Sequence, residues 1–349
     1  MPMNITVLGA GSWGTALASL LSENGHQVTL WARRPELCVE IATYHENHHY
    51  LPNAQLSNQL RTTHSLQNAL QNAQLVLFAV ASAGMSDVVK SAAPWIPQDA
   101  WIVHAVKGFD VQSKLRMSQI ILQQLPWVEP HLSVIAGPSH AEEVIRHMPT
   151  TLVVAGYAQE AAEVVQDALM NHYLRVYTNP DVTGAELGGT LKNIIALGVG
   201  IADGLGFGDN AKAALMTRGL AEITRLGIQM GASVLTFAGL SGVGDLIVTC
   251  TSQHSRNFRA GRLLGQGASL TETLSAVGMV VEGVKSTQVA VLLAQDYQVN
   301  MPIAQVIYEV LFSGKLPKQA VGELMNRERA HEIEEVARAA MAPKWIHPR

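Results

Sequence analysis

The order of hydrophobic and polar residues divides the chain into two parts with different periodicities. From residue 3 to about residue 178, short apolar or β-branched runs alternate with amphipathic stretches, the pattern of a parallel sheet covered by helices. The apolar runs are continuous rather than alternating, which is typical of strands buried on both faces. Strands are therefore predicted at residues 5–8, 26–31, 75–80, 101–106, 132–136, 151–155 and 174–177.

The pattern changes after Asn179-Pro180-Asp181. Strand-like runs end there, and Ala, Leu, Gly and Met recur with helical periodicity in long stretches such as 184–203 and 210–230. We predict a doubly wound α/β domain over residues 1–179, followed by an all-α domain over residues 180–341. Residues 342–349 contain two prolines and are expected to form a frayed tail.

Composition excludes several classes of protein. Of the 349 residues, 48% are hydrophobic and 15% are charged, a balance typical of a compact globular protein. A net charge of −4 provides no basic field for nucleic acid. The two cysteines, Cys38 and Cys250, lack any paired spacing, which argues against a disulfide framework or a structural zinc site and favours a reducing compartment.

Neither a targeting segment nor a membrane span is expected. The N-terminus lacks a cationic segment followed by an apolar stretch and a cleavage site, and it has the pattern of a first strand. The longest uninterrupted apolar run, residues 194–202, is much shorter than a membrane-spanning helix. The sequence therefore predicts a soluble, cytoplasmic protein.

A glycine-rich motif directly follows the first predicted strand. Gly9-Ala10-Gly11-Ser12-Trp13-Gly14 opens an amphipathic helix, and a second strand follows within about thirty residues, as in a Rossmann-type dinucleotide site. Gly9 permits the tight turn, Gly11 lets the backbone approach a pyrophosphate, and Gly14 allows the helix to pack closely on the strand. The helix N-terminus then faces the anion.

The end of the second strand bears on the choice of nucleotide. NAD-selective enzymes usually place a carboxylate there for the ribose 2′-hydroxyl, whereas this chain has Arg33 and Arg34. Guanidinium groups bind phosphate well, so NADPH is the preferred cofactor, with NADH as the alternative. Whether both arginines or only one meets the nucleotide stays open, and Arg33 is the first candidate.

Three segments supply candidate groups for a substrate. Lys107 follows a predicted strand, where α/β sheets bind ligands. Ser139, in Gly137-Pro138-Ser139, is either a helix N-cap or a ligand contact. Lys192 has only Gly188, Gly189, Ile195 and Ala196 as helical neighbours. It is therefore either desolvated with a lowered pKa, which suits proton transfer, or at the helix edge with its stem over apolar surface.

The second half supplies an anion site and a carboxylate. Asp245 stands in a glycine-rich loop and precedes Thr249, while Ser255 is a candidate N-cap of a helix that begins with Arg256 and Asn257. The guanidinium and amide there suit a phosphate, although Arg256 is alternatively a partner of a surface carboxylate. The histidine-rich residues 45–49 follow no ligand spacing, so a solvated loop and no metal are predicted.

Taken together, the motifs resemble those of the bacterial NAD(P)H-dependent glycerol-3-phosphate dehydrogenases, within the 6-phosphogluconate dehydrogenase-like superfamily. The motifs that carry this resemblance are Gly-Ala-Gly-Ser-Trp-Gly-Thr-Ala at 9–16, Val-Lys-Gly at 106–108, Gly-Pro-Ser at 137–139, Leu-Lys-Asn at 191–193, Gly-Phe-Gly-Asp-Asn-Ala-Lys at 206–212 and Gly-Val-Gly-Asp-Leu at 242–246. It covers nearly the whole chain. It implies reversible reduction of dihydroxyacetone phosphate to sn-glycerol 3-phosphate for phospholipid synthesis, in a homodimer.

The resemblance also implies roles for individual residues, with Lys192 as the catalytic proton donor and acceptor. Substrate contacts are implied for Lys107, Gly137, Ser139, Lys192, Asp245, Ser255, Arg256 and Asn257. Cofactor contacts are implied for Ser12, Trp13, Arg33, Tyr50, Lys107, Ala141, Arg256, Val280 and Glu282, in addition to Gly9, Gly11, Gly14 and Arg34 from the motifs above.

The chain departs from the family pattern at two positions. Ala81 replaces the usual proline after the strand at 75–80, and His140 replaces the usual phenylalanine after Gly-Pro-Ser. Both changes bear on local loop shape and on packing beside the nicotinamide. Two alternatives also stay open: a related 3-hydroxyacid dehydrogenase with a carboxylate site in place of the phosphate site, and a regulator that senses NADPH without turnover.

Overall fold

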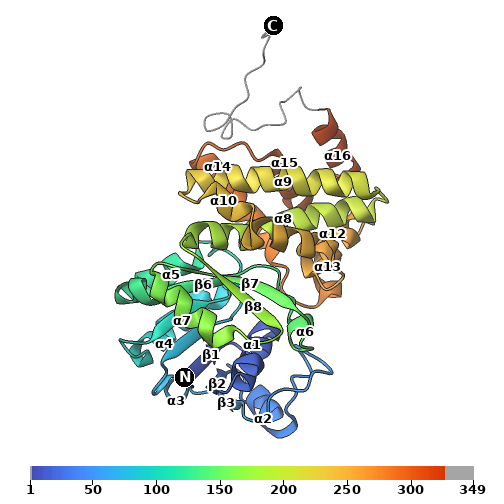
Figure 1. The fold of residues 1–349 in the computed structure, drawn as a ribbon. Coiled ribbons are helices and arrows are strands. Elements are labelled where there is room, and N and C mark those ends of the chain that lie inside the picture. The colour runs from blue at the N-terminus through green and yellow to red at the C-terminus, as the bar shows by residue number, and fades with distance from the viewer. Residues whose placement is uncertain (1, 327–349) are drawn as a thin grey trace.

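The structure, a computed structural model, describes residues 2–326. The tail predicted at 342–349 and the end of the predicted helical domain lie outside these residues. Within them, a sheet flanked by helices forms one part of the molecule and an all-helical region forms the other (Figure 1). The predicted fold class is therefore confirmed.

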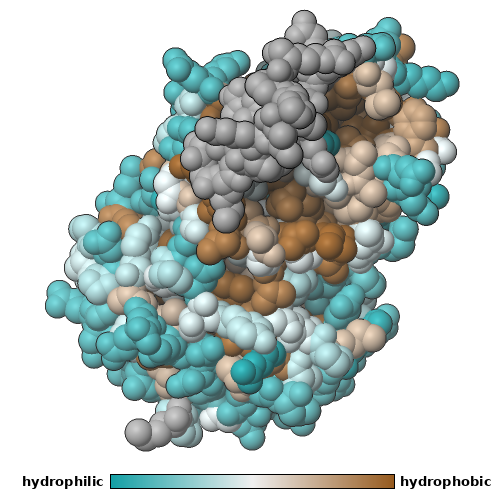
Figure 2. Space-filling view, turned by 45° about the horizontal axis from the view of Figure 1, so that its top comes forward, coloured by the Kyte–Doolittle hydropathy of each residue, from teal (hydrophilic) through white to brown (hydrophobic). Residues whose placement is uncertain are grey.

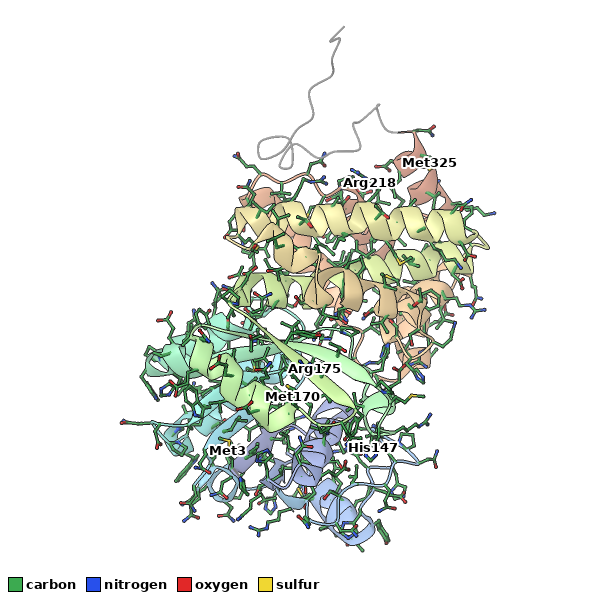
Figure 3. All side chains as sticks on the ribbon, in the orientation of Figure 1. Met3, His147, Met170, Arg175, Arg218 and Met325 are labelled. Atoms are coloured by element: carbon green, nitrogen blue, oxygen red, sulfur yellow. The ribbon has the colours of Figure 1, made fainter. Side chains whose placement is uncertain are left out.

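The first part is built on a single eight-stranded sheet with the order β3-β2-β1-β4-β5-β6-β7-β8. Its strands are β1 (Asn4–Leu8), β2 (Gln27–Trp31), β3 (Arg61–Thr63), β4 (Leu75–Phe78), β5 (Trp101–His104), β6 (Leu132–Ala136), β7 (Thr150–Gly156) and β8 (Leu174–Asn179). Every neighbouring pair runs parallel except β6 and β7. Arg175 projects from the edge strand β8 (Figure 3).

Helices cover both faces of this sheet because successive residues of each strand point to opposite sides. In β1, Ile5 and Val7 pack in one core cluster and Leu8 packs in another. The helical elements here are α1 (Ser12–Glu23), α2 (Pro35–Tyr44), α3 (Leu66–Leu70), η1 (Ser82–Gly84), α4 (Met85–Ala92), η2 (Ala93–Trp95), α5 (Met117–Gln124), η3 (Pro126–His131), α6 (Ala141–Val144) and α7 (Gln159–Leu169). Of these, α1 and α7 contribute to the first cluster, and α3, α4 and α5 contribute to the second.

Two features of the sheet differ from the prediction. Strand β3 was missed because Arg61-Thr62-Thr63 is short, polar and at the sheet edge, with no apolar run to indicate it. A fully parallel sheet was wrong at β7, which pairs antiparallel with β6. The connection between these strands carries only the four-residue helix α6 rather than a full crossover helix, so β7 returns in the opposite direction.

The helical region is assembled around α8 (Val182–Gly204), which is buried along nearly its whole length. Its remaining elements are α9 (Asp209–Gln229), α10 (Val234–Phe237), η4 (Leu240–Gly244), α11 (Asp245–Thr251), α12 (Arg256–Gly265), α13 (Leu270–Val277), α14 (Glu282–Asp296), α15 (Pro302–Phe312) and α16 (Pro317–Met325). The predicted helices at 184–203 and 210–230 correspond to α8 and α9 and are confirmed.

Glycines let α12 approach α8 at backbone distance. A Cβ atom at Gly200 would collide with the Phe258 carbonyl, and one at Gly261 would collide with the Leu197 carbonyl. Close packing of this kind needs a residue without a side chain at each crossing point. As a result, the first turn of α12 is held next to the turn of α8 that carries Lys192.

One helical stretch of the described residues, Val234–Thr251, is long and apolar enough by composition to cross a membrane. It was not predicted as a membrane span, because no uninterrupted apolar run marks it in the sequence. The stretch consists of α10, η4 and α11, all three of which pack against α8, and 44% of it is buried. The core helix of a soluble protein passes the same test. Apolar side chains also gather on part of the molecular surface (Figure 2).

A buried polar network joins the sheet to α8. Glu186, on α8, accepts hydrogen bonds from the Ser118 amide at 2.8 Å and from the Ser118 hydroxyl at 2.7 Å, and it is in contact with the Arg116 guanidinium. The His104 ring, at the end of β5, lies with Nε2 3.1 Å from Glu186 Oε1. Burial alone would raise the pKa of Glu186, but His104, Arg116 and Ser118 outweigh it and lower that pKa to about 2.

We expect Glu186→Gln to lower the free energy of unfolding at pH 7 by about 3–5 kcal/mol, because the substitution leaves Arg116 buried without its counter-ion. The folded pKa of about 2 lies below the ordinary 4.5, so ionisation of Glu186 stabilises the fold above about pH 4.5. That contribution is lost as the pH falls toward 2, and the variant should lack this part of the acid sensitivity.

Chemical denaturation at pH 7 and at several acid pH values measures both effects. Glu272→Gln is the control, because Glu272 is exposed and glutamine can replace glutamate in a capping box. This control should change stability by less than about 1 kcal/mol. An equally small change in Glu186→Gln would contradict the role given to the network.

Candidate active site

The glycine-rich turn between β1 and α1 forms one wall of a long cleft. Gly9 has a φ of +118°, and a Cβ atom there would lie 2.7 Å from the Ala79 carbonyl oxygen, so glycine is required. Gly11 is the N-cap of α1, and a Cβ there would have no atom within 4 Å. No side chain caps α1, so its first amides remain open to an anion.

Asn47 fixes this turn by hydrogen bonds, a role that was not predicted from the sequence. Its side-chain amide donates hydrogen bonds to the Ala10 carbonyl at 3.1 Å and to Thr15 Oγ1 at 2.9 Å. The Tyr50 carbonyl accepts a hydrogen bond from Ser12 Oγ at 2.5 Å. The prediction of a solvated loop at 45–49 is therefore wrong for Asn47, which is fully buried. Its position in a run of polar residues gave no signal of burial.

The cleft has a volume of about 1210 Å³ and is lined by both parts of the molecule. The predicted cofactor residues that line it are Gly9, Gly11, Ser12, Trp13, Arg33, Arg34, Tyr50, Lys107, Arg256, Val280 and Glu282. Gly14 packs instead against the backbone of Gly9, and Ala141 lines a smaller neighbouring pocket. Lys285 also lines the cleft and was not predicted.

Both arginines at the end of β2 are exposed at the cleft. The guanidinium carbon of Arg34 lies 5.6 Å from the centre of the Tyr50 ring, within the range of a cation–π contact. Arg33 makes no such ring contact within the described residues. Two cationic groups are therefore available at the place where a ribose 2′-substituent is expected.

A contact between distant parts of the chain crosses the cleft. Ser82, which follows β4, donates from its hydroxyl to Glu282 Oε2 at 2.7 Å. Glu282 opens α14, 200 residues further along the chain. Ala81, the first departure from the family pattern, is the N-cap residue of η1 and lines the same cleft.

Next to the cleft, two lysines share one buried carboxylate. Lys192 is 5% exposed and Asp245 is fully buried, and Lys192 Nζ contacts Asp245 Oδ1. Lys107 Nζ lies 2.9 Å from the other oxygen of Asp245. Asp245 is fixed at the start of α11, where its carbonyl accepts a hydrogen bond from Thr249 Oγ1 at 2.6 Å. The alternative of Lys192 at a solvated helix edge is therefore excluded.

Burial lowers the pKa of Lys192 to about 7, and the positive charge of Lys107 acts in the same direction while Asp245 opposes it. An amine with this pKa exchanges a proton near neutral pH. Perturbed lysines of this kind concentrate at functional sites.

Lys107 also connects this pair to the turn after β6. Its ammonium group donates to the Gly137 carbonyl at 3.1 Å and to Ser139 Oγ at 3.2 Å. Gly137 has a φ of +104°. The N-cap of α6 is His140, not Ser139, so the capping interpretation of Ser139 is wrong. The chain instead directs the Ser139 hydroxyl to the Gly137 carbonyl at 2.8 Å.

At the start of α12, the predicted cap is present at Ser255, whereas Asn257 makes hydrogen bonds that were not predicted. Ser255 caps the helix, since its hydroxyl accepts from the Phe258 amide at 3.2 Å, which confirms that prediction. The amide of Asn257 donates to Asn193 Oδ1 at 2.9 Å and accepts from the Gly283 amide at 2.9 Å. Asn257 thus ties together α8, α12 and α14, and one N–H of its side-chain amide remains for a ligand.

Within residues 2–326, no group of three or more His, Cys, Asp or Glu side chains is placed to hold a metal ion.

A glycine-rich turn that opens helix amides to a long cleft, next to a buried lysine, defines a Rossmann-type nicotinamide-dependent dehydrogenase. Residues 4–162 match the family described as NAD-dependent glycerol-3-phosphate dehydrogenase N-terminus, and residues 181–322 match the corresponding C-terminus family. The chain belongs to the glycerol-3-phosphate dehydrogenase family.

Individual relatives agree with this assignment. The chain is 55% identical to glycerol-3-phosphate dehydrogenase [NAD(P)+] of Pelotomaculum thermopropionicum, over 97% of this chain and 98% of the relative. It is 52% identical to the Bacillus subtilis enzyme of the same name, over 95% and 96% of the two chains. The crystal structure of glycerol-3-phosphate dehydrogenase from Coxiella burnetii superposes with a TM-score of 0.89 at 36% identity, over 93% of this chain and 99% of that one. These matches favour the family over the hydroxyacid dehydrogenase left open above.

Two glycine substitutions should separate folding from cofactor binding. Gly9→Ala places a methyl group against Ala79 at a strained φ and should lower the free energy of unfolding by about 1–3 kcal/mol. Gly11→Ala has open space around its methyl group, so stability should be unchanged. It should nevertheless weaken NADPH binding by about tenfold or more, because the methyl group blocks the approach of the pyrophosphate.

Thermal unfolding and titration of nucleotide fluorescence measure the two properties. Normal NADPH affinity in Gly11→Ala would contradict the position assigned to the pyrophosphate.

Proposed function

We propose that this protein catalyses the reversible reduction of dihydroxyacetone phosphate to sn-glycerol 3-phosphate with NADPH or NADH, and so supplies phospholipid synthesis. The observation that carries the proposal is the buried Lys192, with its lowered pKa, in contact with Asp245 and next to the cleft. The membership of the chain in the family supports the same reaction.

The cleft suits a nicotinamide dinucleotide. The uncapped amides of α1 and the open space at Gly11 would hold the pyrophosphate, and Trp13, Tyr50, Val280 and Glu282 would form the walls. The reduced nicotinamide supplies a hydride when bound. NADPH is the proposed preference, because Arg33 and Arg34 are both exposed where a 2′-phosphate would lie.

Lys192 carries the proton in this mechanism. As the central carbonyl carbon gains hydride, the carbonyl oxygen becomes an alkoxide and takes a proton from the Lys192 ammonium; in oxidation the neutral amine takes that proton back. Asp245 holds Lys192 in place. Lys107 contacts both Asp245 and Ser139 and so holds them in position next to Lys192. Gly137, Ser139, Ser255, Arg256 and Asn257 are the further residues proposed to contact the substrate.

The proposal extends to a cytoplasmic homodimer. Family likeness supports both properties. The exposed apolar side chains of the helical region, such as Leu235 at 81% exposure, add support for a subunit interface.

The direct test mixes the protein with NADPH and dihydroxyacetone phosphate and follows the loss of nicotinamide absorbance. We expect Lys192→Met to lower kcat by about 10²–10⁴-fold with NADPH affinity intact, because the substitution keeps the apolar stem but removes the proton.

The reduction rate of the wild type should fall as the pH rises through about 7, since the donor must be protonated, and the oxidation rate should rise over the same range.

Lys212→Met is the matched control, since Lys212 stands on α9 and pairs with Asp203 and Asp209 away from the cleft. It should leave kcat unchanged. More than about a tenth of wild-type kcat in Lys192→Met would assign the proton transfer to another group. Absence of turnover by the wild type at any concentration would favour the non-catalytic NADPH sensor.

Arg33→Ala should weaken NADPH by about 10- to 100-fold while changing NADH little, since a charge-assisted hydrogen bond to phosphate contributes about 1.5–3 kcal/mol. Kd values for both nucleotides, measured for Arg33→Ala, Arg34→Ala and the double variant, would divide the effect between the two arginines. Equal losses for NADPH and NADH would remove the 2′-phosphate role.

A further inference from the structure

The segments that follow four neighbouring parallel strands lie along the sheet side of the cofactor cleft. In the sheet order β2-β1-β4-β5, these segments carry the two exposed arginines, the glycine-rich turn, Ser82 and Lys107. Because neighbouring strands are about 4.8 Å apart, the four groups follow one another along one edge of the sheet. A dinucleotide with its 2′-phosphate at the arginines and its pyrophosphate at the turn therefore extends its nicotinamide riboside past Ser82 toward Lys107.

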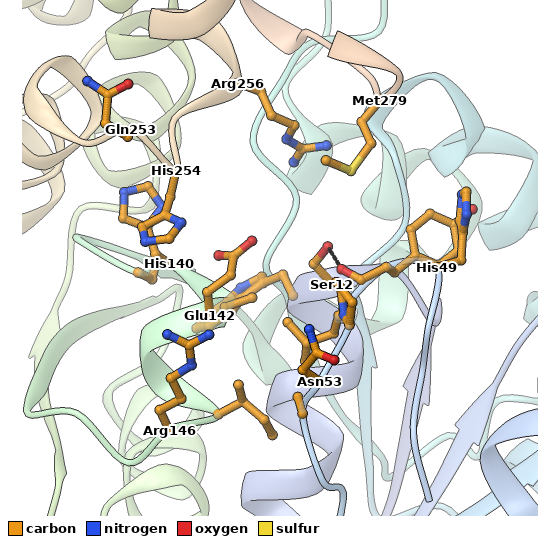
Figure 4. A pocket seen from close by; sticks show the side chains of 18 of the residues that line it. Ser12, His49, Asn53, His140, Glu142, Arg146, Gln253, His254, Arg256 and Met279 are labelled. Atoms are coloured by element: carbon orange, nitrogen blue, oxygen red, sulfur yellow. Dashed lines mark hydrogen bonds between the residues drawn. The ribbon is translucent and has the colours of Figure 1, made fainter. Parts of the chain in front are cut away.

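The helical region supplies the opposite wall of the cleft. Residues 278–281, which join α13 to α14, line this wall, and Glu282 follows them as the first residue of α14. Figure 4, a close view of the smaller pocket beside the cleft, shows Met279 and Arg256 on the helical side and Ser12 on the sheet side. All three also line the cleft itself. A bound cofactor would therefore lie between the glycine-rich turn and the segment that leads into Glu282.

Ser82 binds both oxygens of the Glu282 carboxylate. Its hydroxyl donates to Oε2 at 2.7 Å, and its backbone amide donates to Oε1 at 3.3 Å. Gly108 packs against the same contact, since a Cβ atom there would lie 2.6 Å from Ser82 Cβ and 3.2 Å from Glu282 Oε2. Ser82 is only 2% exposed, so water has little access to its hydroxyl. The carboxylate is therefore held in one place and one orientation.

This position puts Glu282 next to the proton-transfer centre. Gly108 directly follows Lys107, whose ammonium group is 2.9 Å from Asp245. A carboxylate repels phosphate but accepts hydrogen bonds from hydroxyl and amide groups, which the nicotinamide riboside carries. An ionised carboxylate has about four lone-pair sites, and Ser82 occupies two of them. Glu282 can therefore accept a hydrogen bond from the cofactor while Ser82 holds it.

We propose that Ser82 is a positioning residue for the nicotinamide half of the cofactor: it holds Glu282 where the carboxylate accepts a hydrogen bond from the nicotinamide riboside. Ser82 itself does not line the cleft and acts through Glu282. The inference rests on the proposed function, because it takes the reacting end of the cofactor to lie beside Lys192. Without the serine hydroxyl, the Glu282 side chain gains freedom to turn, whereas the adenosine half of the cofactor keeps all its contacts.

The first experiment compares NADPH with adenosine 2′,5′-bisphosphate, which has the adenosine and the 2′-phosphate but lacks the nicotinamide riboside. Ser82→Ala should raise the Kd of NADPH by about tenfold or more, the loss expected for a charge-assisted hydrogen bond. The Kd of the bisphosphate, measured by isothermal titration calorimetry, should be unchanged. Parallel losses for both ligands would show a merely structural role, and an unchanged Kd of NADPH would show no role. Either result would overturn the proposal.

Ser86→Ala is the matched control. Ser86 is on α4, one turn beyond Ser82, and it does not line the cleft. The substitution removes a hydroxyl from the same segment of the chain, so both Kd values should match those of the wild type. A loss of NADPH affinity equal to that of Ser82→Ala would assign the effect to the segment as a whole and would also overturn the proposal.

A double-mutant cycle tests whether Ser82 acts through Glu282. Glu282→Gln should weaken NADPH at least as much as Ser82→Ala, because the carboxylate is the group that meets the cofactor. The protein with both substitutions should then bind NADPH no more weakly than Glu282→Gln. Losses that multiply in the double variant would mean that Ser82 acts independently of Glu282, contrary to the proposal.

Turnover separates this inference from the proposed function. In Ser82→Ala, KM for NADPH should rise while KM for dihydroxyacetone phosphate, measured at saturating NADPH, stays the same. A selective loss of NADPH binding, together with no reduction of dihydroxyacetone phosphate by the wild type, would support the role of Ser82 and refute the proposed function. Turnover by the wild type with the same KM for NADPH in Ser82→Ala would do the reverse.

Discussion

The structure depends on one carboxylate shared by two lysines. Asp245 is fully buried, and without it Lys107 and Lys192 would place two positive charges close together in a poorly solvated site. Each partner comes from a different element: the segment after β5, the middle of α8 and the start of α11. The sheet and the helical region must therefore meet at a fixed distance, and much of the remaining packing serves that requirement.

Three other sets of contacts hold α8 in place. On one side of α8, Glu186 anchors the helix to residues that follow β5 and open α5. One turn later, the backbone of Gly189 lies against the side chain of Lys107, where a Cβ atom would be 3.7 Å from Cγ. On another side, glycines bring α12 against α8 at backbone distance. Because protein interiors are close-packed, these contacts leave α8 little freedom to shift along its axis.

Much of this arrangement could be predicted from the sequence, where the signal is local. Strand β1, the glycine-rich turn and α1 follow one another within a short segment, and Lys192 is conspicuous in an apolar helix. What could not be predicted depends on distant pairing. Asn47 donates hydrogen bonds to Ala10 and Thr15, which precede it by 37 and 32 positions. Glu186 contacts Arg116, which precedes it by 70 positions. No periodicity indicates such partners, and the direction of β7 was likewise decided by its short connection rather than by its own residues.

The hydrogen bonds of Asn257 have a consequence for how the enzyme can change over evolution. They tie Asn193, the neighbour of Lys192, to Gly283, the neighbour of Glu282 in the cofactor cleft. A Cβ atom at Gly283 would lie 2.7 Å from the Asn193 carbonyl oxygen, so this wall tolerates little substitution. Arg33 and Arg34 also line the cleft, but both are exposed, and Arg34 contacts the Tyr50 ring. Substitutions at these two exposed arginines can therefore accumulate between lineages with little effect on packing, while the wall next to Lys192 is inherited as a unit.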